Sequence, residues 1–189
     1  MRRLQVLTVL VAFVVASFVL PAQQIETGPD GNQIVKFTPG QQAAIDRFLN
    51  AHPNLIQANC ANFELSPKDC AASYSDWHRI VVETKAAPQS QYAAWGNYSH
   101  HPSADLVIPF FSKTSVNNWG WRRWQIVVFE SIGENQYKPI VALTDSWAVC
   151  FDGIFYHPVR KRVEFWCKSM GGNVSWNGAT FVGRLEKGD

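Results

Sequence analysis

The fold is decided by two runs of sequence, Trp124-Gln-Ile-Val-Val-Phe-Glu130 and Tyr137-Lys-Pro-Ile-Val-Ala-Leu143. Both runs are rich in β-branched and aromatic residues and are separated by turn-forming residues, which is typical of neighbouring strands. Asn177-Gly178 is the strongest hairpin signal of the chain. Further short runs of this kind lie at 104–111, 147–151, 154–157, 163–168, 173–176 and 180–185. No strand–helix–strand alternation is present, so the pattern predicts a mostly antiparallel sheet.

Helices are predicted upstream of these strands. Thr38 can cap a helix with Pro39 in its first turn, and Gln41 occupies the capping-box position. A second helix is predicted to start at Ser66-Pro67, with Tyr74 and Trp77 on its apolar face. The sequence therefore predicts an α+β fold in which N-terminal helices pack on a mostly antiparallel β-sheet of short strands.

The first 22 residues have the pattern of a secretory signal peptide. Arg2 and Arg3 precede an apolar run from Leu4 to Leu20, and Pro21-Ala22 offers a small residue for cleavage. An uncleaved anchor helix is the alternative, although the run is short for a membrane span. We expect a secreted or periplasmic protein with an extended lead-in over residues 23–37, including a turn at 28–31, and one α+β domain over residues 38–189.

Charge excludes one class of partner. The chain has 17 Lys and Arg residues against 15 Asp and Glu, and the leader holds two of the arginines. The mature net charge is thus near zero, which gives no general attraction for polyanions. We expect no nucleic-acid partner, and no membrane association after signal cleavage.

Four cysteines suggest two local disulfides in an oxidising compartment. Cys60 and Cys70 flank a polar loop, and Cys150 and Cys167 flank a predicted hairpin with its turn at residues 157–160. That turn would place Cys150 opposite Cys167, within reach of a disulfide. The other two pairings stay open. Zinc is the competing interpretation, but it is disfavoured because no CxxC pair is present.

The segment from Trp95 to Leu106 resembles the calcium loop of FG-GAP/VCBS-type secreted proteins, and the likeness extends over about residues 92–129. The resemblance places four residues at ligand positions: Asn97, Ser99, His101 and Asp105. Pro102 replaces the loop glycine, and Asp105 is the only carboxylate among the four positions. A hard cation needs several such oxygens, so we expect a degenerate FG-GAP-like loop with no metal and no cofactor.

No catalytic motif stands out in the chain. A nucleophile elbow, a His-Glu-x-x-His helix and a phosphate-binding glycine loop are all missing from the sequence. The acids are scattered, and Asp76-Trp77-His78 is the kind of tripeptide that arises by chance.

A surface candidate lies between two predicted strands. Trp119 and Trp121 alternate onto one face and Arg122 follows them, so they could form a binding platform; the alternative is that the tryptophans fill the core. The leading hypothesis is a non-catalytic exported module that binds a protein or a carbohydrate. The alternative is a small secreted hydrolase with a carboxylate pair or a His–Asp site.

Overall fold

The chain is described by a computed structural model at residues 24–27, 33–60, 62, 67–86, 90–99, 101, 104–116, 122–148, 152–167 and 170–187. The helices are α1 (Pro39–Ala51) and α2 (Pro67–Glu83). The strands in the first half of the chain are β1 (Gln24–Thr27), β2 (Gln33–Lys36), β3 (Leu55–Gln57) and β4 (Ala94–Gly96). Those in the second half are β5 (Asp105–Val116), β6 (Arg122–Gly133), β7 (Gln136–Ala148), β8 (Gly153–His157), β9 (Arg162–Cys167), β10 (Met170–Trp176) and β11 (Phe181–Lys187).

The strands form two main sheets and one separate hairpin. The first sheet has the order β3-β5-β6-β7, with β4 also paired to β5, and the second has the order β11-β10-β9-β8. β1 pairs only with β2, and every pairing among the described strands is antiparallel. The α+β class with mostly antiparallel pairing is confirmed, whereas the expected single sheet is replaced by two.

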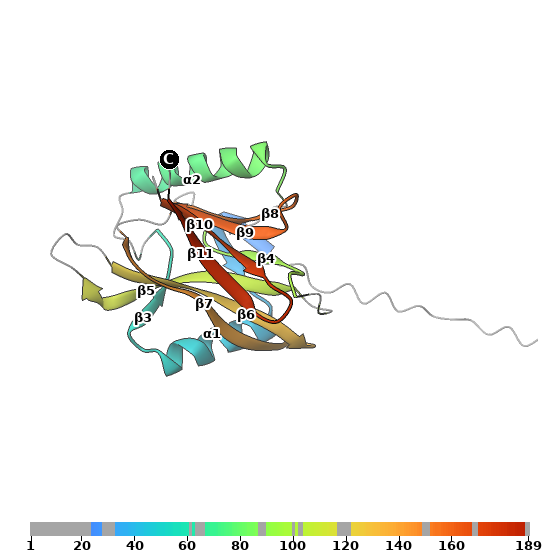
Figure 1. The fold of residues 1–189 in the computed structure, drawn as a ribbon. Helices are drawn as coiled ribbons and strands as arrows, with labels where there is room; N and C mark the ends of the chain where they lie inside the picture. The colour runs from blue at the N-terminus through green and yellow to red at the C-terminus, as the bar shows by residue number, and fades with distance from the viewer. Residues whose placement is uncertain are drawn as a thin grey trace, which may run out of the picture.

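The two main sheets pack face to face, with one helix outside each (Figure 1). The core between them joins Val107, Ile126 and Val128 of the first sheet to Ile154 and Phe165 of the second. On its other face the first sheet meets α1, where Phe48 contacts Phe110 and Phe129. Because β5 and β6 carry apolar side chains on both faces, they can be covered by a sheet on one side and a helix on the other.

α2 covers the outer face of the second sheet, whereas α1 covers the outer face of the first. Trp77 is buried against Phe155, and its Nε1 donates to the carbonyl oxygen of Ile154 at 3.0 Å. A Cβ on Gly153 would lie 2.1 Å from the Trp77 ring. The absence of a side chain at Gly153 is therefore what allows α2 to approach β8.

Both helix predictions hold where the chain is described. Thr38 and Gln41 form the expected capping box at the start of α1. Trp77, with Tyr74 packed beside it, forms the predicted apolar face of α2, while Ser66 lies outside the described residues.

The predicted hairpins are confirmed, with one change of register. Trp176 pairs with Phe181 across the Asn177-Gly178 turn, and Gly178 has a φ of 97°. In the β8–β9 hairpin, however, His157 pairs with Arg162, so the turn is one residue later than predicted. The expected strand at 147–151 is not separate where it is described, because β7 continues to Ala148.

The register shift corrects the expected position of two cysteines. Gly153 pairs with Trp166, and the amide of Asp152 donates to the carbonyl of Trp166, so the ladder carries Asp152 rather than Cys150 toward Cys167. Cys60 is the only cysteine whose side chain is described; it is buried, and it is not a free thiol. The side chains of the other three cysteines lie outside the description, so both disulfide pairings stay predictions.

The predicted signal peptide stays a prediction, whereas part of the lead-in is described. Residues 1–22 lie outside the described residues, and the lead-in is a hairpin in which Ile25 pairs with Val35. No described helix is long and apolar enough to cross a membrane.

Candidate functional site

A groove of about 560 Å³ lies at one end of the five-stranded sheet. We call it the sheet-end groove. α1 ends at Ala51, and the chain then turns into β3, which forms one wall of the groove. The lining residues come from β5, β6, β7, the start of β3 and the residue before it: Asn54, Leu55, Ser112, Thr114, Arg123, Trp124, Gln125 and Thr144.

Irregular strand pairing shapes this end of the sheet. The β5–β6 register shifts between Phe111 and Val116, and the β6–β7 register shifts between Arg123 and Gln125. Such bulges bend a strand and re-aim its side chains, and they are frequent beside binding sites. Gln125 pairs with Phe110 and Thr144, so its side chain lies on the α1 face of the sheet.

Most side chains of the groove are polar and uncharged. Ser112 is only 5% exposed, whereas Thr114, Arg123 and Thr144 are exposed. Trp124 is 6% exposed, and its ring packs edge-on against Phe165 at 5.3 Å between the two sheets. The groove thus has a fixed base and hydrogen-bonding groups that face solvent.

The binding platform predicted from the sequence consists of Trp119, Trp121 and Arg122, and it shares no residue with the described lining of this groove. Arg122 is half-buried and starts β6, where it pairs with Val116 and Ala148. Trp119 and Trp121 lie outside the described residues, in the segment that joins β5 to β6. The sequence analysis did not identify the hydroxyl and amide residues that line the groove. The polar residues that follow Phe111 in the sequence were the signal that could have indicated them.

The loop that resembles a calcium site is organised around the buried carboxylate of Asp105. One oxygen accepts the amides of Tyr98 and Ser99 at 3.0 and 2.8 Å, and the other accepts the amide of Ser131 at 2.9 Å. The Ser99 hydroxyl lies 2.9 Å from both oxygens. Asp105 therefore serves as an acceptor for protein donors.

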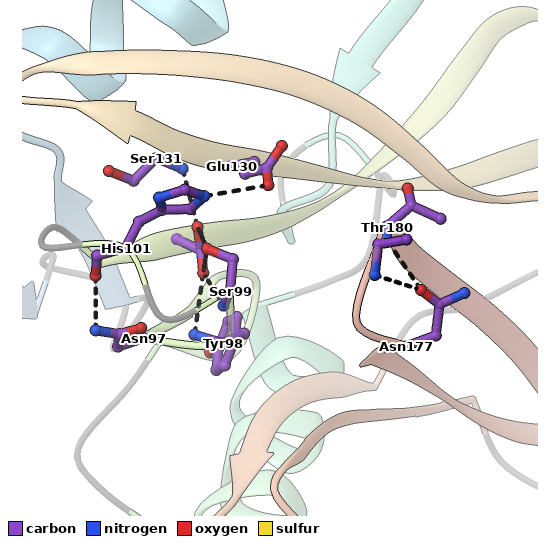
Figure 2. Close-up of polar contacts among 10 residues, drawn as sticks. Asn97, Tyr98, Ser99, His101, Glu130, Ser131, Asn177 and Thr180 are labelled. Carbon is purple, nitrogen blue, oxygen red and sulfur yellow. Dashed lines mark hydrogen bonds and ion pairs between the residues drawn. The ribbon is translucent and has the colours of Figure 1, made fainter.

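The other predicted ligand positions do not converge on Asp105. Asn97 is exposed, and its amide donates to the carbonyl of His101 at 2.7 Å. The His101 ring instead faces Glu130, with Nε2 and Oε1 3.7 Å apart (Figure 2). Among the described residues, no three His, Cys, Asp or Glu side chains gather to hold a metal.

The side chain of Tyr98, a residue of this loop, lies in the core between the sheets. Its ring packs on Tyr156 at 5.0 Å, and its hydroxyl is buried without a hydrogen-bond partner among the described residues. Burial raises the pKa of Tyr98 well above its usual value, and Tyr156 and Asp105 raise it further.

A second hollow, of about 300 Å³, lies beside α2 on the outer face of the four-stranded sheet. We call it the α2 hollow. Its walls include Thr84 and Trp166, and its rim carries His157, Arg160, Glu164 and Glu186.

The acids of the α2 hollow are held by arginines. Arg160 Nη1 and Arg162 Nε each lie 2.8 Å from one oxygen of Glu164, and Arg162 Nη1 lies 3.3 Å from Glu186. Burial alone would raise the pKa of Glu164, but the bonds from Arg160 and Arg162 outweigh it, so the pKa is lowered.

The tripeptide Asp76-Trp77-His78 does not form a site. Asp76 and His78 are exposed on α2; Asp76 is 3.8 Å from Arg79, and the His78 ring lies against Tyr74 at 5.9 Å. The Trp77 side chain is buried in the core, whereas its two neighbours are exposed. The acid and the base therefore do not meet in a cleft beside Trp77.

No protein-family model matches this sequence, and no curated protein or solved structure matches it either.

Proposed function

We propose that the protein is an exported, non-catalytic module that binds a carbohydrate in the sheet-end groove. The observation that carries the proposal is the gathering of hydroxyl, amide and guanidinium side chains at one end of a sheet face. Hydroxyl groups both donate and accept, amides do so with separate atoms, and a guanidinium donates, which matches the needs of sugar hydroxyls. The groove also falls within the usual volume range of ligand pockets.

The rigidity of the groove supports binding. Gln125 and Thr144 stand on paired strands, and buried Trp124 and Ser112 fix the base beneath them. A pre-formed site loses little conformational freedom when the ligand binds. Trp119 and Trp121, in the segment between two of the lining strands, are the rings that we expect to stack on a sugar.

The lining favours a carbohydrate over a protein partner. The centres of protein interfaces are enriched in aromatic residues, methionine and arginine, whereas serine is depleted there. The described lining carries two residues of the enriched types, Arg123 and the buried Trp124, against five hydroxyl and amide residues. Export is supported by the leader pattern and by the cysteine content of the chain.

A hydrolase is the second candidate, because the α2 hollow brings Glu164, Glu186 and His157 to one rim. A glycosidase needs one carboxyl group that remains protonated. Glu164 is unsuited to that role, since two arginines lower its pKa. If the hollow is catalytic, Glu164→Gln and Glu186→Gln will each abolish hydrolysis of an oligosaccharide that the unaltered protein cleaves.

A glycan array probed with the purified protein tests the leading proposal. We expect binding to a defined set of oligosaccharides, and Gln125→Ala and Thr144→Ala should each weaken it by about fivefold to tenfold, as loss of one hydrogen bond does. Thr180→Ala, in the exposed turn before β11, is the matched control and should bind normally. An array without any bound glycan, or equal binding by all three variants, would refute the site.

A further inference from the structure

The turn between β10 and β11 carries a reactive dipeptide. We propose that Asn177 is a site of spontaneous covalent modification, at which the backbone nitrogen of Gly178 attacks the side-chain amide and an aspartate or isoaspartate replaces the asparagine. Asn177-Gly178 is the only Asn-Gly pair in the sequence, and both residues are exposed. The turn lies outside the sheet-end groove, so the proposal does not depend on what the groove binds.

The turn itself holds the side chain of Asn177 (Figure 2). Its Oδ1 accepts the backbone amides of Ala179 at 3.0 Å and Thr180 at 2.9 Å. The backbone amide of Asn177 donates in turn to the carbonyl of Thr180 at 3.1 Å. An asparagine side chain often closes a turn in this way, in place of a backbone carbonyl. The oxygen of the reacting amide is therefore fixed against two N–H donors.

These two donors face the charge that the reaction develops. Attack on Cγ of Asn177 converts Oδ1 into an oxyanion, and N–H groups that already point at such an oxygen stabilise it. Hydrogen bonds to an ionised acceptor are roughly twice as strong as those to a neutral one. Both bonds should therefore strengthen as the oxyanion forms, which lowers the barrier to attack.

Gly178 supplies the nucleophile. Its backbone amide makes no hydrogen bond among the described residues, and a Cβ built on it would meet nothing within 4 Å. Its φ of 97° is one that glycine adopts without strain. No side chain therefore shields this nitrogen from solvent or from a base.

The reaction balances with water as its only co-reactant. The nitrogen of Gly178 gives its proton to water or hydroxide and forms a bond to Cγ of Asn177. The bond from Cγ to Nδ2 then breaks, and Nδ2 takes up a proton and leaves as ammonia. Water opens the resulting cyclic imide at either of its carbonyl carbons, which gives aspartate or isoaspartate.

A variant with a second Asn-Gly pair isolates the contribution of the turn. Asn135 is exposed between β6 and β7, and its side chain makes no hydrogen bond among the described residues. Gln136→Gly gives Asn135 the same following residue as Asn177, but not the two donors. The full-length variant is kept at mildly alkaline pH, both folded and in guanidinium chloride, and peptide mass spectrometry follows the loss of each side-chain amide.

In the folded variant, we expect Asn177 to convert roughly tenfold faster than Asn135, because two strengthened hydrogen bonds lower its barrier. Asn177 should also convert faster in the folded chain than in guanidinium chloride, where the two sites should react at similar rates. Conversion of Asn177 that is absent from the folded chain, or slower there than in the denaturant, would overturn the proposal. Equal rates at both sites of the folded variant would overturn the role of the two donors.

Discussion

At the scale of single residues, Asp105 is the organising group of the 97–101 loop. Its buried carboxylate accepts three backbone amides, two from the loop and one from Ser131. Asp105→Ala would leave those donors buried without an acceptor, at a cost of at least about 3 kcal/mol in the free energy of unfolding. Urea unfolding would measure the loss, and Ser99→Ala, which keeps all three amide bonds, should cost only about 1 kcal/mol.

The same residue decides whether the loop binds calcium. Protein donors already occupy both oxygens of Asp105, so millimolar calcium should leave the melting temperature unchanged. A calcium-dependent rise of several degrees that disappears in Asp105→Ala would contradict this, because a ligand that binds the native state must stabilise it. The sequence could predict the acceptor role within the loop, but the bond to Ser131 arises only from the β5–β6 pairing.

The buried hydroxyl of Tyr98 gives a prediction about pH. Its folded pKa lies well above the value of about 10 in an unfolded chain, so the unfolded state loses its proton first as the pH rises. The stability that this difference in pKa contributes is fully present below about pH 10 and is lost as the pH rises toward the folded pKa. In Tyr98→Phe, the free energy of unfolding should therefore decrease less steeply between about pH 10 and pH 12 than in the unaltered protein.

At pH 7 the same variant should be neutral or slightly stabilising, because it removes a buried hydroxyl that lacks a hydrogen-bond partner among the described residues. Urea titrations at several pH values would test both effects. Tyr92 and Tyr137 also have raised pKa values, so part of the alkaline slope should remain. An unchanged slope in Tyr98→Phe would rule out its contribution.

At the scale of elements, the attachment of α2 depends on Gly153. Gly153→Ala would drive a methyl group into the Trp77 ring and should lower the unfolding free energy by about 1–3 kcal/mol. Gly171→Ala is the matched control, since its Cβ would meet only the carbonyl oxygen of Phe165 at 3.5 Å. Thermal unfolding would compare the two; equal effects would mean that the Trp77 contact does not limit the packing of α2.

Elements with strong local signals could be predicted from the sequence. The capping box of α1 and the Asn177-Gly178 hairpin depend on neighbouring residues alone, so both were found. The β8–β9 register was not predicted because Lys161 in the turn has a φ of 50°. A residue other than glycine rarely adopts this conformation, so the sequence does not indicate it.

At the scale of the whole molecule, the division into two sheets could not be predicted. Runs such as 106–111 are apolar on both faces, and the sequence does not say whether a helix or a second sheet covers each face. The sheet-end groove depends on this division and on bulges in β5, β6 and β7, which explains why sequence reasoning reached the neighbouring Arg122 but not Gln125 or Thr144.

The most direct test of the central claim is an NMR titration of the ¹⁵N-labelled protein with an oligosaccharide selected on the array. We predict that amide shifts will concentrate at Asn54, Thr114, Gln125 and Thr144 and will leave the α2 hollow, represented by Glu164 and Trp166, unchanged. Shifts that concentrate at the α2 hollow, or a saturated titration without shifts at the groove, would contradict the account.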